Sequence, residues 1–146
     1  MEQKGVTFCV QAFGTEAAAI TFTGSLDKVT AAFREALEKR LQKKGMAPAA
    51  TGSGGVPAQV EVSGRFVRVD EGNRWLRYLL TFFAGHAIVE VEGEAKLTGN
   101  KIADLHHVAK QAGGFFGGGN ESLLVLCARS CGNTFADRVI KAIRAI

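Results

Sequence analysis

Residues 87–97 read Ala-Ile-Val-Glu-Val-Glu-Gly-Glu-Ala-Lys-Leu, and apolar residues alternate with charged ones along this stretch. One side of an extended chain would carry Ala87, Val89, Val91, Ala95 and Leu97. The other side would carry Glu90, Glu92, Glu94 and Lys96. This alternation predicts a β-strand with one buried and one solvated face, which is typical of an antiparallel sheet.

The residues on both sides of this strand predict two further strands. Downstream, Thr98-Gly99-Asn100-Lys101 has the chemistry of a hairpin turn centred on Gly-Asn, and it leads into a strand over residues 102–109. Upstream, apolar residues change side along residues 60–69, with Val60, Val62 and Phe66 on one side and Val67 and Val69 on the other. We interpret this change as a β-bulge near Gly64.

Two other segments have the apolar spacing of helices. The first runs from Ser25, a predicted N-cap, to Gly45, a predicted stop. The second is residues 121–146, where Gly132 weakens the middle by about 1 kcal/mol. A break at that point, with residues 123–126 as a strand, is the alternative. Residues 6–13 predict a strand, and residues 20–22 a short strand or a loop.

These elements predict a single α+β domain over residues 1–146. We expect a two-layer sandwich, with two helices on one face of a mostly antiparallel sheet, in the order β-α-β-β-β-α. Residues 45–58 are interpreted as a flexible connector within that domain, because the segments on either side are too short to bury separate cores.

Composition excludes several classes of protein. The chain of 146 residues is 47% hydrophobic and 22% charged, so it is not disordered as a whole. Its net charge of +4 is mild, and the basic cluster at residues 39–44 is typical of a solvated helix end rather than of a nucleic-acid surface. No stretch is apolar enough to span a bilayer, and residues 1–13 lack a secretory signal pattern. The chain is therefore expected to be either cytosolic or a mature fragment with a new Met1.

A glycine-rich run precedes the last helix, with five of the 18 glycines between Gly113 and Gly119. Such runs can cradle phosphates at a helix N-terminus. Here Asn120-Glu121-Ser122 follows the run, so a carboxylate occupies the first helical turn and no Lys-Ser/Thr pair is present. We interpret the run as a connector, and we expect no cofactor.

The groups that most often carry chemistry show no catalytic or metal-binding spacing. His106 and His107 are adjacent on a predicted strand and would face opposite ways. Cys127 and Cys131 are four residues apart and would share one face of a helix. They are interpreted as core thiols, as a disulfide in a broken helix, or as a redox or metal-binding pair. The glutamates of residues 90–94 follow the outward face of a strand, where Arg65 or Arg68 could pair with them. We therefore predict no catalytic residues, no metal site and no enzyme.

Residues 74–85 contain the only tryptophan and the only tyrosine, flanked by arginines, without a clean period. Such a segment is either a buried connection or an apolar surface for a partner, for self-association or for a membrane interface. The candidate binding residues are Arg74, Trp75, Arg77, Tyr78, Phe82 and Phe83.

Several motifs occur in an order that resembles a bacterial family of domains of unknown function, number 4410. They are Gly72-Asn73-Arg74, Arg77-Tyr78, Ala84-Gly85, the strand from Ala87, the turn at 98–101 and the glycine run. The resemblance covers about residues 58–146. Members look like envelope lipoproteins or periplasmic proteins without established catalytic activity. The resemblance thus implies a mature envelope fragment, and we expect Arg77 to be a structural arginine that binds carbonyls of the glycine loops.

The resulting functional hypothesis is a non-enzymatic, envelope-associated protein-binding or assembly module. Its partner would be another envelope protein or a second copy, with no nucleic acid, and with membrane attachment only through an anchor outside this chain. It would lie in the periplasm or at the outer membrane if the chain is a mature fragment, and in the cytoplasm if Met1 is the native start. The alternative is a cytosolic small-ligand or nucleotide-binding domain that uses the glycine run.

Overall fold

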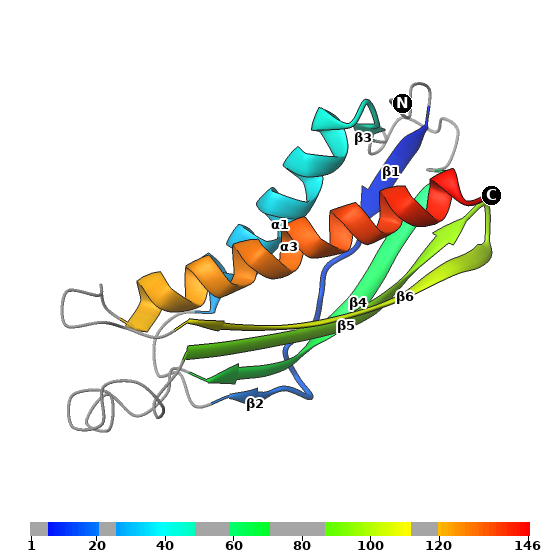
Figure 1. Ribbon diagram of the computed structural model, residues 1–146. Coiled ribbons are helices and arrows are strands. Elements are labelled where there is room, and N and C mark those ends of the chain that lie inside the picture. The colour runs from blue at the N-terminus through cyan, green and yellow to red at the C-terminus, as the bar shows by residue number, and fades with distance from the viewer. Residues whose placement is uncertain (1–5, 21–25, 49–58, 71–86, 112–119) are drawn as a thin grey trace.

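The computed structural model describes residues 6–20, 26–48, 59–70, 87–111 and 120–146. Two helices lie on one face of a six-stranded sheet whose order is β3-β1-β4-β5-β6, with β2 also paired to β4 (Figure 1). The strands are β1 (Thr7–Val10), β2 (Ala19–Ile20), β3 (Ala47–Pro48), β4 (Val60–Asp70), β5 (Ala87–Leu97) and β6 (Asn100–Gln111). The helices are α1 (Asp27–Lys43) and α3 (Asn120–Arg144). The predicted α+β class is confirmed.

The three long strands form an antiparallel meander, as the alternation of residues 87–97 predicts. Strand β5 has the predicted bounds and pairs with β4 on one side and β6 on the other. The hairpin that joins β5 to β6 is tighter than predicted. Its two turn residues are Thr98 and Gly99, with φ values of 47° and 88°, so the turn centre is Thr-Gly rather than Gly-Asn. Two consecutive positive φ angles match the twist of antiparallel strands.

The predicted bulge in β4 exists, but it does not lie at Gly64. The register with β5 shifts between Phe66 and Arg68, which returns Val69 to the buried face that Val60 and Val62 share. Gly64 instead lies where β4 and β5 approach closely. A Cβ at that position would be 2.1 Å from the carbonyl oxygen of Glu92, so no larger residue fits without movement of the backbone.

Helix α1 lies where its apolar spacing predicts, with buried Val29, Phe33, Leu37 and Leu41. It begins one residue later than a Ser25 cap implies. The N-cap position is Leu26, whose side chain cannot accept a hydrogen bond, and Ser25 lies outside the described residues. The predicted stop is confirmed, because Gly45 has a φ of 96° directly after the C-cap residue Lys44.

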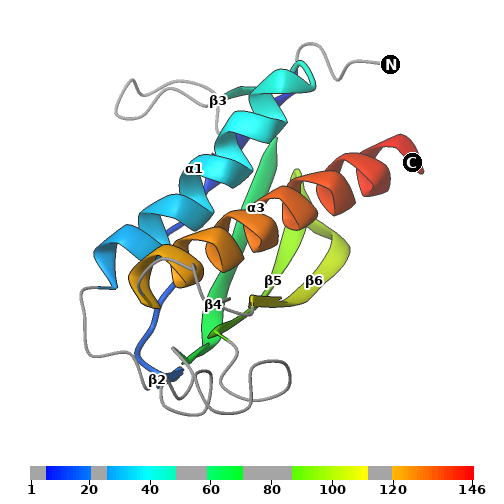
Figure 2. The same ribbon diagram turned by 60° about the vertical axis from the view of Figure 1, so that its left-hand side comes forward.

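Helix α3 is continuous over 25 residues, so the predicted alternative with a strand at 123–126 is wrong. Gly132 serves the packing of the two helices instead of breaking the second one. A Cβ on Gly132 would be 2.5 Å from the carbonyl oxygen of Phe33 in α1. The missing side chain therefore lets the two helix backbones approach closely where they cross (Figure 2).

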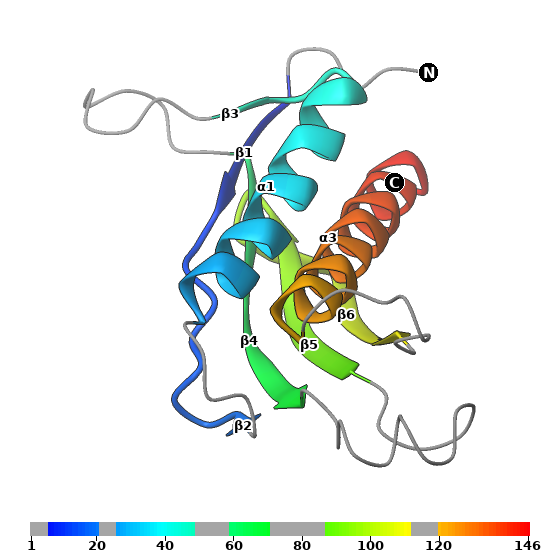
Figure 3. The same ribbon diagram turned by 90° about the vertical axis from the view of Figure 1, so that its left-hand side faces the viewer.

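The core lies between the helix layer and the sheet (Figure 3). Its largest side chains include four phenylalanines, Phe8, Phe33, Phe66 and Phe135, each at most 1% exposed. The short strands β1, β2 and β3 run parallel to their neighbours, which the sequence did not predict. Strand β3 also lies within residues 45–58, which the sequence predicted as a connector without a strand. Neither of the two helices described is long and apolar enough to cross a membrane.

Candidate functional site

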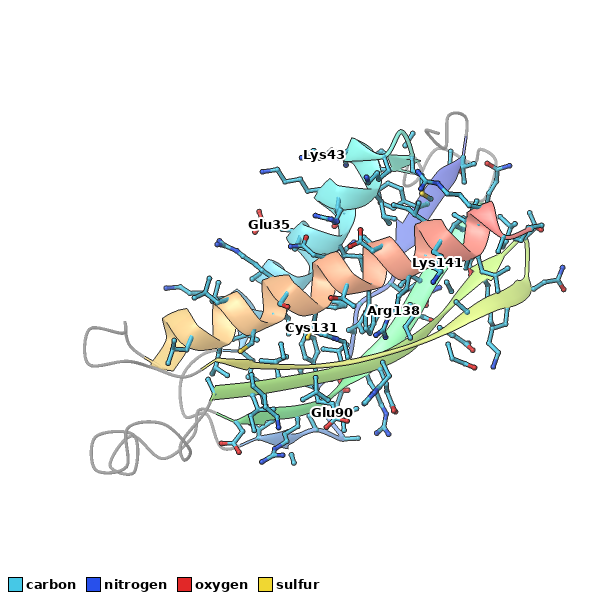
Figure 4. All side chains as sticks on the ribbon, in the orientation of Figure 1. Glu35, Lys43, Glu90, Cys131, Arg138 and Lys141 are labelled. Atoms are coloured by element: carbon cyan, nitrogen blue, oxygen red, sulfur yellow. The ribbon has the colours of Figure 1, made fainter. Side chains whose placement is uncertain are left out.

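The face of the sheet away from the helices is charged, and its charges are arranged in cross-strand pairs. Arg65 Nε lies 2.7 Å from Glu92 Oε1, which confirms the predicted pairing of an arginine with the glutamate stripe. His106 Nε2 lies 2.6 Å from Glu90 Oε2. Figure 4 shows Glu90 on the side of the sheet opposite the helices. Arg68 does not join the stripe, because it pairs with Asp70 in its own strand at 2.9 Å.

A shallow depression of about 510 Å³ lies on this charged face. It forms around Gly64 and Gly93, which are directly opposite each other in the register of β4 and β5. Neither glycine has a side chain, and the walls come from charged residues that already have partners, such as Arg65 with Glu92. In the part of the chain that the structure describes, no three His, Cys, Asp or Glu side chains come together as metal ligands.

The two buried cysteines are free thiols that lie over the seam between β5 and β6. Cys127 Sγ is 3.5 Å from the carbonyl oxygen of Ala87, and Cys131 Sγ is 3.5 Å from that of Val89. Burial raises the pKa of Cys127 to about 11 and that of Cys131 to about 12. A reactive cysteine needs a lowered pKa, so of the three sequence interpretations the geometry favours core thiols.

The position of Cys131 also reveals how the backbone of β6 points. Its Sγ lies near the carbonyl of His107 in β6, at 4.0 Å, as well as near that of Val89 in β5. Both carbonyls therefore point into the seam between the strands. Because successive carbonyls of a strand point to opposite sides, the carbonyl of His106 points away from β5. Arg138 of α3 donates a hydrogen bond to it, and Figure 4 shows Arg138 directed from α3 toward the sheet.

Strand β6 therefore has an open edge. Among the described residues it pairs only with β5, over a length of 12 residues. The side chains of Asp104, His106, Val108 and Lys110 alternate along its outer face and are exposed. The opposite border of the sheet differs, since β3 is two residues long and contains Pro48. Short strands and proline both protect a sheet edge from pairing, whereas a long strand invites it.

The two histidines of β6 face opposite ways, as predicted. His106 is exposed on the charged face. His107 points toward the helix layer and is half-buried, where burial lowers its pKa, with smaller effects from Arg138 and His106. His86 lies outside the described residues.

The binding residues proposed from sequence cannot be placed. Arg74, Trp75, Arg77, Tyr78, Phe82 and Phe83 all lie outside the described residues, as does the glycine run 113–119. The open edge of β6 was missed at the sequence level. Its signal was present in the alternation of charged residues along 104–110, but periodicity does not tell which strand of a sheet ends up at the border.

Comparison with known proteins identifies the family and the fold. The model of a family described as Domain of unknown function (DUF4410) matches residues 22–114. This match begins earlier than the motifs at 58–146 suggest and ends before α3. No curated protein matches the chain.

Several solved structures share the fold. Protein XCC0632 from Xanthomonas campestris, of a family named DUF330, has a TM-score of 0.67 at 5% identity, covering 97% of this chain and 87% of that chain. The hypothetical protein CT253 from Chlamydia trachomatis has a TM-score of 0.62 at 11% identity, covering 97% and 99%. The PelC dodecamer from Paraburkholderia phytofirmans has a TM-score of 0.52 at 13% identity, covering 88% and 87%. Identities this low indicate a common fold only.

Proposed function

The chain belongs to the DUF4410 family of domains of unknown function, and we propose that it is a non-enzymatic assembly module whose copies associate through the edge of β6. The observation that carries this proposal is the long open edge of β6, where backbone groups such as the carbonyl of His106 point away from β5. Addition of a strand to such an edge is a common mode of protein recognition. That PelC, a chain of similar fold, is a dodecamer adds support for assembly.

The charges along β6 favour a second copy of the same strand as the partner. If two β6 strands pair antiparallel about a two-fold axis at His107, Asp104 of each copy lies opposite Lys110 of the other. In the same register Val108, which is 37% exposed, lies opposite His106. Opposite charges facing each other across strands contribute about 0.2–1 kcal/mol per pair, and the symmetry supplies two such pairs.

The helix layer is compatible with this arrangement. Helix α3 lies over the seam of β5 and β6, because Cys131 contacts carbonyls of both strands. Strands in a sheet are about 4.8 Å apart, so the two copies of α3 would lie roughly 10 Å apart across the axis. That separation is close to the usual 8–10 Å distance between packed helices, so roughly one layer of side chains fits between them.

Arg138 competes with a partner strand in this arrangement. Its guanidinium donates a hydrogen bond to the outward carbonyl of His106, and a partner β6 strand would need that same carbonyl as a hydrogen-bond acceptor. The dimer should therefore be weak, and it should dissociate reversibly into monomers at low concentration. Replacement of Arg138 by methionine, which keeps the apolar stem and removes the donor, should shift the equilibrium toward the dimer.

A charge-swap series tests the proposal by light scattering coupled to size exclusion, over a range of concentrations. Asp104→Lys and Lys110→Asp should each weaken the dimer, because each places like charges opposite one another. The double variant should restore it, and an equal mixture of the two single variants should form heterodimers. Glu94→Lys, the same charge change on the internal strand β5, is the matched control. A monomer at every concentration, in both wild type and Arg138→Met, would contradict the proposal.

We also propose, from what the family resemblance implies, that the protein acts in the cell envelope. Fractionation of cells that express the native gene with an epitope tag tests this placement. Recovery of the protein in the periplasmic or outer-membrane fraction supports it. Recovery in the cytoplasm alone supports instead the cytosolic alternative.

A further inference from the structure

The outer surface of the helix layer contains a groove with unbalanced positive charge. The groove lies between α1 and α3, on the side away from the sheet, and has a volume of about 470 Å³. Its basic side chains are Lys39, Arg40 and Lys43 of α1 and Arg129 of α3, and among the described residues that line it Glu35 is the only acidic one. Figure 4 shows Glu35 and Lys43 on α1, away from the sheet.

The close crossing of the helices produces the shape of this groove. Gly132 brings the two backbones together, and Ala36 lies beside it, 3.0 Å from where a Cβ on Gly132 would be. Ala32 and Ala36 therefore line the groove with methyl groups only, while long basic side chains line its walls. A compact anion could approach the helix surface closely there while the cations surround it.

Most of these cations are not neutralised by the protein itself. Arg40 is tethered, since its Nε lies 2.6 Å from Asp137 Oδ1 across the helix interface. Within the described residues, Lys39, Lys43 and Arg129 form no ion pair. Elsewhere on the surface, basic residues such as Arg34, Arg65 and Lys101 do have acidic partners. The groove thus brings together three cations that have no acidic partner among the described residues.

We propose that this groove binds a phosphate-bearing ligand. Arginine forks and lysine ammonium groups together are the side chains that bind phosphate oxygens best, and the volume is that of a small-ligand site rather than of a peptide surface. Asn133 supplies a further amide donor from α3. The same chemistry fits a soluble phosphate ester and the headgroup of an anionic phospholipid. The site is on the opposite side of the molecule from the charged face of the sheet and does not depend on assembly through β6.

Two binding measurements on the full chain test the proposal and separate the two sources of phosphate. Calorimetric titration with pyrophosphate reports a soluble ligand. Flotation with vesicles of equal parts phosphatidylglycerol and phosphatidylcholine, against phosphatidylcholine alone, reports a headgroup. Lys39→Gln/Lys43→Gln and Arg129→Gln should each weaken binding, by about tenfold for every cationic side chain that is replaced. Glu35→Gln should strengthen it, because it removes the carboxylate of the groove.

The matched control is Lys96→Gln/Lys141→Gln, which removes the same charge outside the groove and away from the edge of β6. Binding that falls in the groove variants and not in this control supports the site. Pyrophosphate binding identifies a soluble ligand, and vesicle binding alone identifies a headgroup. Absence of binding to both probes overturns the proposal, as does an equal decrease in groove and control variants, which would indicate attraction by net charge only. Circular dichroism spectra should be unchanged, because the altered side chains are solvent-accessible.

Discussion

The two faces of the sheet have the same strands and register but are held by different forces. On the helix side, Val89, Val91 and Ala95 of β5 are fully buried and belong to the same core cluster as the aromatic rings of Phe33 and Phe66. On the other side of the same strand, Glu92 forms an ion pair with Arg65 and Glu90 contacts His106, and these side chains remain partly exposed. Packing tolerates little change, whereas exposed ion pairs each contribute about 1 kcal/mol or less. Stability should therefore depend on the helix side, which leaves the outer face and the edge free to vary with function.

The largest effect should come from the aromatic cluster on the helix side. The ring centroid of Phe33 lies 4.8 Å from that of Phe13, 5.4 Å from Phe66 and 5.5 Å from Phe135. Phe33→Ala should lower the free energy of unfolding by about 3–5 kcal/mol, because it leaves a cavity among these rings. Urea denaturation measures the change. A decrease of less than about 1 kcal/mol would mean that the two faces differ less than the packing indicates.

Gly132 tests whether the helices need their close crossing. In an ordinary exposed helix, replacement of glycine by alanine stabilises by about 1 kcal/mol. Here the new Cβ would be 2.5 Å from a backbone oxygen of α1, so Gly132→Ala should destabilise by about 1–3 kcal/mol. Ser130→Ala, at an exposed position of the same helix, is the control. A more stable Gly132→Ala variant would show that the helices can separate without cost.

The thiols make the helix side sensitive to alkaline pH. The pKa of Cys131 is raised from 9.0 to about 12 and that of Cys127 to about 11, so the folded state retains protons that the unfolded state releases. The contribution of the thiols to the free energy of unfolding is complete below pH 9, and it is lost as the pH rises toward the pKa values of the folded state. In that range the free energy of unfolding should decrease by about 1.4 kcal/mol per pH unit for each thiol. Thermal melts between neutral and strongly alkaline pH should show a smaller slope in Cys131→Ala.

The smallest effect should come from the outer face. Arg65 and Glu92 form a short ion pair, but their side chains are 51% and 42% exposed. A double-mutant cycle with Arg65→Ala and Glu92→Ala should give a coupling energy of about 0.2–1 kcal/mol, which decreases in high salt. A coupling as large as the Phe33→Ala effect would remove the contrast between the faces.

The contrast between the faces could be predicted from sequence, and the assembly of the sheet could not. Alternation along residues 87–97 is local, so it predicts both the bounds of β5 and its solvated side. The parallel pairing of β1 with β3 and β4 depends on contacts between distant residues, and a strand as short as Ala47–Pro48 has no measurable period. The sequence predicts the N-cap of α1 at Ser25 because serine is a favoured capping residue, whereas the helix has Leu26 at that position. The edge of β6 and the groove between the helices are tertiary features, and no single segment encodes them.

The parallel arrangement of β1 also constrains the order in which the chain folds. Thr7 and Gln59 exchange hydrogen bonds, from Thr7 N to Gln59 Oε1 at 3.2 Å and from Gln59 N to Thr7 Oγ1 at 3.1 Å. This pair of hydrogen bonds joins residues 52 positions apart, whereas the β5–β6 hairpin has a loop of only two residues. Long loops lose more entropy on closure and slow the folding rate. We therefore expect the hairpin to nucleate early and β1 to dock late. Removal of the hydrogen bonds between Thr7 and Gln59 should then mainly accelerate unfolding.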